Sequence, residues 1–488
     1  MRKLLILLGF VGCLFCNSAR AAEMVNVEYI HLLIEQKWGI TVPYNPSVTN
    51  PKVAANMEYL LGMVDITNKR LNGTATTDYL HSEYATQYAA DTVAANDAVS
   101  RLIVDWSPKF FVTTTSTTSS FSFKMSARGT FMIDWGDGTR DIIKRTDTSE
   151  TTYSHTYSAA GARTIGIGGR AMEYNTKPAI AAISFWSNTN VAGISGALGA
   201  IFSTIGDGAQ SGQQPRFYRT FSGCSNLSGS IPENLFAGIS GAPASSMFCG
   251  TFSSCRGLTG PIPENLFAGI SGAPASSMFY GTFSSCRGLT GPIPENLFAG
   301  ISGKPEWYMF KETFSGCSGL TGSIPEKLFA RISGAPAMGM FHKTFSGCSN
   351  LSGSIPGNLF AGISGAPASS MFYGTFYECS GLTGPIPENL FAGISGAPAE
   401  DMFVYTFYKC SGLTSIPENL FGNISGAAQR SMFFCMFCNG TSLTGPSAKI
   451  NGKYLYKIWP SATSVQVGGC YLGDTGLDDY ADIPAAWK

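Results

Sequence analysis

The chain has 488 residues, and its 32 lysine and arginine residues are balanced by 32 aspartate and glutamate residues. This length exceeds what one ordinary core covers, so we expect several domains or a repeat array. The even charge argues against nucleic-acid binding, which needs clustered positive charge, and the low charged fraction, 13%, suits an exported protein.

The first residues predict a signal peptide over 1–21. The basic MRK is followed by the apolar run LLILLGFVGCLF, and Ala19 and Ala21 frame a small-residue cleavage site. Cys13 leaves open the alternative of a lipid anchor, although the residues before it fit that pattern poorly. The apolar run is too short to span a membrane, and we find no other apolar segment of 18 residues. We therefore expect a secreted or cell-surface protein with no transmembrane segment after signal removal.

Residues 22–106 predict a small helical segment. Apolar residues recur every three or four positions in VEYIHLLIEQKW, and again in DYLHSEYATQYAADTVAANDAVSRLI. Nothing in this segment indicates a chemical role.

The pattern changes to a period of two residues after Pro108, in FSFKM and then in FMIDWGDGTRDII. Alternation around a D-G-T turn predicts β-strands joined by a tight turn. The string DWGDGT, followed by YSHTY, resembles the motifs of PKD-type β-sandwich domains. The resemblance implies a sandwich over 107–170, with Trp135 in its core. Asp134 and Asp137 suggest calcium, but two carboxylates fall short of the six to eight oxygens that this ion takes.

A repeat dominates the chain from residue 180. Phe252–Gly272 recurs letter for letter as Phe283–Gly303, which is 31 residues further on. Rows of leucine, isoleucine and phenylalanine keep the same spacing, and so does a row of cysteines. The cysteines are Cys224, Cys255, Cys286, Cys317, Cys348, Cys379 and Cys410. We interpret them as buried free thiols, because cysteine behaves as a small apolar residue in such positions.

Each copy predicts a short strand followed by two short helices. In one copy LTGPI alternates as a strand, and Leu297, Phe298 and Ile301 lie on one face of a helix. Phe279, Phe283 and Cys286 have the i, i+4, i+7 spacing of a second helix. Stacked strands lie about 4.8 Å apart and packed helices about 8–10 Å apart, so such a stack curves. The predicted fold class is an α/β solenoid over 180–447, a curved leucine-rich-repeat stack preceded by the β-sandwich and the helical segment.

The repeat also resembles a family. The pattern FSGCSGLTGSIP, followed by M-F-x-x-T-F, is similar to the BspA-like leucine-rich repeat surface proteins. The resemblance covers about residues 200–445 and implies a secreted or surface-exposed protein used in adhesion. The chain shows no recognisable anchor, which leaves the mode of attachment open.

The last segment, 448–488, predicts a C-terminal cap. Cys435, Cys438 and Cys470 break the regular cysteine row near this end, and a disulfide among them would staple the cap. Cys435 and Cys438 form a C-x-x-C pair, which without a second pair is a weak zinc signal. We predict no metal and no cofactor.

The repeat copies differ most at the turns, and there we place the candidate binding residues. They are Lys304, Trp307, Tyr308, His342 and Lys343. Trp307 and Tyr308 are the best anchors, because large aromatic residues dominate binding energy at interfaces. Drift of exposed turns is the alternative explanation for this variation.

We find no nucleophile motif, phosphate loop or dinucleotide fingerprint, so the chain is not expected to be an enzyme. The expected function is adhesion or recognition of an extracellular protein or glycan. A structural spacer or surface-layer component is the alternative. A secreted hydrolase with an accessory PKD-like module is a third possibility, and it would need its catalytic site within 22–106.

Overall fold

The computed structural model describes residues 108–202, 214–418, 420–422 and 424–488. Residues 108–141 and 145–488 form one compact unit, which contains two β-sheets and the repeat copies. The predicted signal peptide and the predicted helical segment 22–106 lie outside the described residues.

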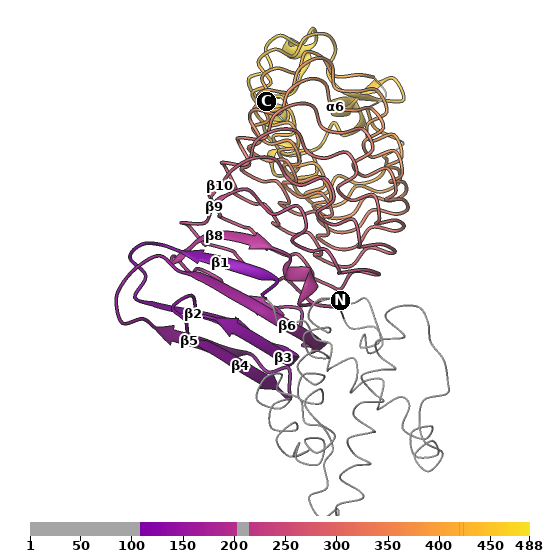
Figure 1. The fold of residues 1–488 in the computed structure, drawn as a ribbon. Helices are drawn as coiled ribbons and strands as arrows, with labels where there is room; N and C mark the ends of the chain where they lie inside the picture. Colours follow the sequence, from indigo (N-terminus) through magenta and orange to yellow (C-terminus); the bar gives the residue numbers. More distant parts are fainter. Residues whose placement is uncertain (1–107, 203–213, 419, 423) are drawn as a thin grey trace, which may run out of the picture. The chain divides into compact units, whose positions relative to one another are not determined.

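The two sheets at the start of the described chain are built from eight strands (Figure 1). A five-stranded sheet has the order β4-β3-β6-β1-β8, and a three-stranded sheet has the order β5-β2-β7. Strand β6 is antiparallel to both β1 and β3, β8 is antiparallel to β1, and β2 is antiparallel to both β5 and β7. The strands are Phe110–Thr114 (β1), Ser120–Met125 (β2), Ala127–Asp134 (β3), Arg140–Arg145 (β4), Thr151–Thr156 (β5), Thr164–Tyr174 (β6), Ile183–Ser184 (β7) and Val191–Gly196 (β8).

Aromatic side chains fill the space between the two sheets. Phe123 of β2 stacks on Phe185 with ring centroids 5.4 Å apart, and it lies 6.2 Å from Trp135, which follows β3. Phe110 of β1 lies 6.1 Å from Phe185. These rings are buried, so the alternation seen in the sequence produces a core between two layers. Strands β7 and β8 belong to these sheets, so the two sheets extend beyond residue 170, the predicted end of the sandwich.

The DWGDGT string contacts His155 and Tyr157 of the YSHTY string. The hydroxyl of Tyr157 donates to the carbonyl of Trp135 at 3.0 Å, and the indole nitrogen of Trp135 donates to Asp141 at 2.9 Å. The ring of His155 stacks on Trp135 at 5.1 Å, and its Nε2 lies 2.7 Å from Asp137. These motif residues therefore brace the turn after β3.

Consecutive repeat copies lie on one another as stacked loops (Figure 1). Strands Ser228–Gly229 (β9) and Gly257–Leu258 (β10) pair in parallel, and later copies meet through single parallel bridges such as Gly260 with Leu289. Gly260 has a φ of +74°, which glycine adopts without strain and which ends the extended stretch. The expected LTGPI strand is therefore reduced to a bridge.

The predicted α/β solenoid is wrong, because the described repeat copies contain turns where two helices per copy were expected. Where the second helix was placed, Ser277, Gly281 and Ser285 have φ between +56° and +62°. An α-helix needs right-handed residues throughout, so one left-handed residue in every four prevents it. The described chain is β-rich, with antiparallel sheets and few helical residues.

Backbone hydrogen bonds in these segments alternate between two directions. The N–H of Phe248 donates to Met278 of the next copy at 2.8 Å, whereas the N–H of Thr251 donates to Phe248 in its own copy at 3.3 Å. Half of the backbone N–H groups in these segments therefore donate to the next copy, and the other half donate within their own copy. An α-helix would direct each donor four residues back instead. The predicted curvature, which depended on helices being wider than strands, loses its physical cause.

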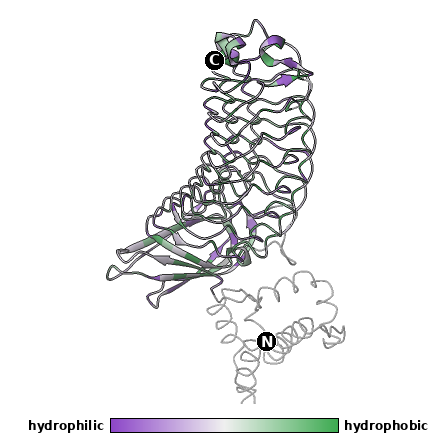
Figure 2. Cartoon of the chain, turned by 90° about the horizontal axis from the view of Figure 1, so that it is seen from above, coloured by the Kyte–Doolittle hydropathy of each residue, from purple (hydrophilic) through white to green (hydrophobic). Residues whose placement is uncertain are grey.

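Phenylalanine rings stack through the interior of the repeat copies, and Figure 2 shows hydrophobic residues recurring from loop to loop. Phe279 stacks on Phe248 and on Phe310, with centroids 5.8 Å apart in both pairs. The thiol of Cys286 donates to the carbonyl of Phe252 at 2.9 Å. The seven cysteines of the row are buried and free, which confirms their interpretation as buried thiols.

Short elements close the C-terminal end. They are Lys449–Ile450 (β11), Lys453–Tyr454 (β12), Leu455–Ile458 (α6), Ser464–Val467 (α7), Tyr480–Asp482 (η3) and Ala485–Trp487 (η4), and one further turn, Leu198–Ala200 (η2), follows β8. In the part of the chain that the structure describes, no helix has the length and apolar character that crossing a membrane requires.

Candidate functional site

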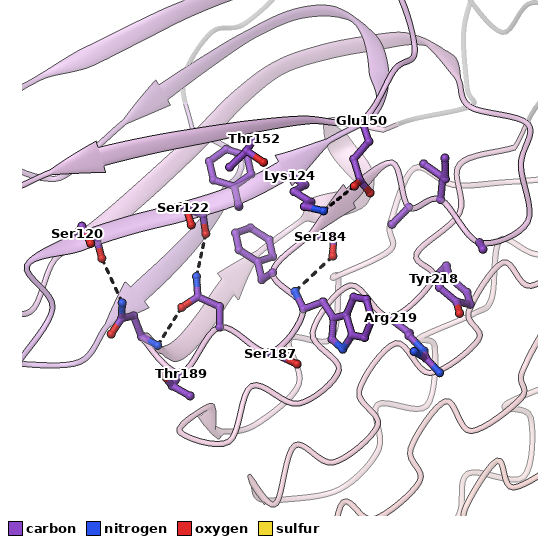
Figure 3. A pocket seen from close by; sticks show the side chains of 18 residues that line it. Ser120, Ser122, Lys124, Glu150, Thr152, Ser184, Ser187, Thr189, Tyr218 and Arg219 are labelled. Carbon is purple, nitrogen blue, oxygen red and sulfur yellow. Dashed lines mark hydrogen bonds and ion pairs between the residues drawn. The ribbon is translucent and has the colours of Figure 1, made fainter.

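A pocket of about 790 Å³ lies where the three-stranded sheet meets the first repeat copy (Figure 3). One wall is the outward face of β2, on which Ser120, Ser122 and Lys124 alternate with buried residues. Tyr218 and Arg219 of the first repeat copy form the opposite end. The remaining lining comes from 150–152 and from the segment 179–190.

Two asparagines of the pocket lining bind the edge of β2. Strand β7 pairs with β2 only at Lys124 and Met125, so the edge of β2 beyond these residues lacks a backbone partner from β7. The side-chain amide of Asn188 donates to the carbonyl of Ser122 at 2.8 Å, and that of Asn190 donates to the carbonyl of Ser120 at 3.1 Å. These bonds satisfy the sheet edge and hold the segment after β7 against it.

Trp186 is the largest exposed group in the pocket. Its neighbours Phe185 and Ser187 donate backbone hydrogen bonds to Thr220 and Ser222, both at 2.7 Å, which fixes the chain on either side. The Trp186 side chain is nevertheless 56% exposed. Because the backbone on either side is fixed and the indole is uncovered, Trp186 offers a flat apolar surface to a ligand, and little entropy is lost when the ligand binds.

Arg219 lies over two rings at this end of the pocket. Its guanidinium carbon is 5.1 Å from the ring centroid of Trp186 and 5.4 Å from that of Tyr218, both within cation–π range. Elsewhere in the lining, Lys124 and Glu150 form an ion pair at 2.6 Å (Figure 3). The pocket therefore presents aromatic faces, hydroxyls, amides and both signs of charge.

Three of the residues selected from the sequence lie along one row of the repeat copies. The amine of Lys311 is 5.0 Å from the ring of Tyr308, and the ring of His342 stacks on Tyr373 at 4.6 Å. Lys343 lies over the same Tyr373 ring at 5.7 Å. The structure thus brings Tyr308, His342 and Lys343 into one band of aromatic and basic side chains.

The other two residues selected from the sequence are Lys304 and Trp307, which directly precedes Tyr308. Lys304 is exposed, and the Trp307 side chain is 60% exposed. Neither residue lines the pocket. They stay candidates on their exposure alone.

A second hollow of about 390 Å³ opens near the C-terminal end of this band. Lys343, Cys435 and Cys438, all selected from the sequence, contribute to its lining. The other lining residues are Tyr373, Tyr377, Tyr405, Tyr408, Phe434, Asn439 and Leu472. Aromatic rings pack against one another across it, as in the stacked pair Tyr377 and Tyr408 at 4.7 Å.

The three cysteines of the predicted disulfide are free and buried in the structure. The hydrogen bond between Cys435 and Cys438 holds the pKa of Cys435 below its usual value and raises the pKa of Cys438. Burial raises the pKa of Cys470 well above its usual value. Cys435 therefore carries more thiolate character than Cys470, and a disulfide in the cap stays a prediction.

The carboxylates that suggested calcium are already occupied by protein donors. Asp134 accepts from the N–H of Gly136 at 3.1 Å and from Arg140 at 2.9 Å. Asp137 accepts from Thr139 and from His155, and these bonds hold its pKa far below the usual range. Among the described residues, no group of three or more histidine, cysteine, aspartate or glutamate side chains could hold a metal ion.

His342 gives a testable pH dependence. Burial, with lesser contributions from Lys311 and Lys343, lowers its pKa to about 3. Glu312 lies 4.0 Å from Nδ1, too far for a hydrogen bond, and Nδ1 has no partner, so burial outweighs the carboxylate. The unfolded chain therefore binds one more proton between pH 6.5 and 3, and stability is lost as the pH falls through this range.

His342→Tyr should remove this loss, because tyrosine occupies the equivalent position at Tyr280 and Tyr373. We expect the free energy of unfolding of the wild type to fall relative to the variant by about 1 kcal/mol per pH unit below pH 6. Urea unfolding of both proteins at pH 7, 6, 5 and 4 measures the difference. A constant difference over that range would contradict the burial of a neutral imidazole.

Sequence reasoning missed the Trp186 pocket because its lining comes from three separate stretches: the predicted sandwich, the segment 179–190 and the first repeat copy. One signal was available. Phe217–Phe221 (FYRTF) aligns with FCGTF at 248–252 and with FYGTF at 279–283 and 372–376, and it places arginine where these three copies have glycine. Other copies have Glu312, Lys343 and Tyr405 at this position. Arginine occurs at this position in the first copy alone, and this was the signal in the sequence.

Comparisons with protein-family models, with curated proteins and with solved structures found no match to this chain. The function must therefore be argued from the pocket itself.

Proposed function

We propose that this is a secreted or surface-exposed recognition protein that acts without catalysis and binds a glycan in the Trp186 pocket. The observation that carries the proposal is the exposed indole of Trp186 at one side of a 790 Å³ hollow lined by serines, threonines and asparagines. The proposed export rests on the leader pattern of residues 1–21.

The pocket matches the surface of a sugar ring. A pyranose has a face of C–H groups and a rim of hydroxyls, so it stacks on an aromatic ring while its rim forms hydrogen bonds. Trp186 supplies the ring, and the outward Ser120 and Ser122 supply hydroxyls opposite it. Binding sites generally combine an apolar surface with a few placed polar groups.

The charged groups of the pocket favour binding over hydrolysis. Glycoside hydrolysis uses two carboxylates on opposite sides of the scissile bond. Glu150 is the one carboxylate among the lining residues, and its partner is Lys124 at 2.6 Å. We therefore assign these groups to ligand contact and to the shape of the pocket.

Replacing Trp186 with alanine should abolish most glycan binding. We expect an affinity loss of about 10- to 100-fold, because the ring is exposed before binding and would be covered afterwards. A glycan array followed by titration calorimetry on the selected saccharide measures the effect. The melting temperature of the variant should stay within about 2 °C of the wild type, since an exposed side chain is removed.

Two further variants distinguish binding in the Trp186 pocket from binding at the turns of the repeat copies. Val465→Ala removes another exposed apolar side chain, 62% exposed, outside the pocket and should bind as the wild type does. Trp307→Ala tests the turn residue selected from the sequence. If Trp307→Ala loses binding and Trp186→Ala keeps it, the site lies on the repeat turns. If the wild type binds no glycan, the recognition proposal fails and the structural spacer becomes the better account.

A further inference from the structure

We infer that the Trp186 pocket selects acidic saccharides, and that Arg219 binds the anionic group of the sugar. This inference rests on the proposed function and adds the chemical class of the ligand. A carboxylate and a sulfate share the required chemistry, namely a charged group with oxygens that accept parallel hydrogen bonds from a guanidinium.

Arg219 has a charge that no described residue neutralises. Among the described residues, no carboxylate lies within ion-pair distance of its guanidinium, and no hydrogen bond of its side chain is found. The other arginine nearby, Arg216, is different, because it donates to the carbonyls of Ser245 and Asn175 at 3.0 and 2.9 Å. Arg216 supports the fold, whereas Arg219 is available to a ligand.

The two aromatic rings hold the Arg219 guanidinium in a defined position. Trp186 and Tyr218 lie 5.1 and 5.4 Å from the guanidinium carbon, so the guanidinium rests against ring faces. Contacts of this kind cover the face of the planar group and leave its N–H edges for hydrogen bonds in the plane. Ordering before binding lowers the entropic cost of capturing an anion.

The second cation of the pocket does not compete for this role. Lys124 is neutralised by Glu150 at 2.6 Å (Figure 3). A ligand anion placed beside Lys124 would also approach the Glu150 carboxylate, and repulsion between the two negative charges disfavours that position. The anionic group is therefore directed to Arg219, with the sugar ring against Trp186.

The test compares three saccharides on the full chain by titration calorimetry. They are a glucuronate-terminated disaccharide, the glucose-terminated counterpart and its 6-sulfated form. We expect the two acidic ligands to bind at least tenfold more tightly than the neutral one, and Arg219→Gln to remove this preference. Arg219→Lys should restore part of it, because lysine keeps the charge but loses the planar pair of donors. Raising the salt concentration should weaken only the acidic ligands.

Arg287→Gln serves as the control, because Arg287 is an exposed arginine of a repeat copy that does not line the pocket. The backbone N–H of Arg219 donates to Cys249 at 2.8 Å and is retained in each variant, so folding should persist. Equal binding of neutral and acidic ligands, lost in Trp186→Ala but kept in Arg219→Gln, would overturn this inference and leave the proposed function standing. Absence of binding to all three ligands and to the glycan array would overturn both.

Discussion

Phe279→Ala is expected to destabilise the repeat copies by about 3–5 kcal/mol, the range for truncating a buried phenylalanine. Its ring has no exposed surface. It stacks at 5.8 Å on the equivalent rings of the copies before and after it. It also packs at 5.0 and 4.5 Å against Phe267 and Phe298. The four neighbouring rings are held by their own contacts and cannot all move to fill the resulting cavity. The loss of unfolding free energy should therefore lie in the upper part of this range.

Tyr280→Ala is the matched control, since Tyr280 is the next residue but is only half-buried. We expect it to cost about 1 kcal/mol, as is common for partly exposed sites. Guanidinium unfolding followed by circular dichroism measures both variants. The first transition is compared, because long repeat arrays do not always unfold in one step. Equal effects of the two variants would contradict an interior ladder of phenylalanine rings.

The repeat region shows how much of this fold could be predicted from the sequence. The 31-residue register identified the inward-facing residues, including Phe283 and Cys286, and both are fully buried. The same register led to the wrong backbone conformation for the segments that carry these residues, because it predicted helices where the structure has turns. The spacing i, i+4, i+7 is shared by an α-helix and by a series of four-residue turns. What separates the two is a left-handed residue at every fourth position, as at Ser277 and Gly281, and serine gives no clear signal of that conformation.

The candidate site was harder to predict because it joins three separate stretches of the chain. Outward serines of β2, Trp186 after β7 and Arg219 of the first copy are brought together by backbone bonds from 185–187 to 220–222. No single stretch carries a motif. The residues selected instead, such as His342 and Lys343, were found by comparing repeat copies. That comparison covers Arg219 but not β2 or the segment 179–190, which supply the rest of the lining.

Asp474→Asn should stabilise the C-terminal cap at alkaline pH. Burial raises the pKa of Asp474 to about 8. One carboxyl oxygen accepts from the N–H of Gly440 at 2.8 Å, while the other is buried without a partner. The folded state therefore keeps a proton that the unfolded state has already lost above pH 4. Stability from this group is complete below that pH and is lost as the pH rises to about 8, with a slope of about 1.4 kcal/mol per unit.

Asparagine keeps a carbonyl for the Gly440 bond and stays neutral at every pH. We expect wild type and Asp474→Asn to unfold with similar free energies at pH 4 and to differ by about 3 kcal/mol or more at pH 8.5, the variant being more stable. Asp478→Asn is the control, because that carboxylate is exposed on the same segment. Thermal and urea unfolding at both pH values give the comparison. If the variant were less stable than the wild type at pH 8.5, Asp474 would be ionised in the folded cap and held by a partner, since only a stabilised charge would make its removal costly.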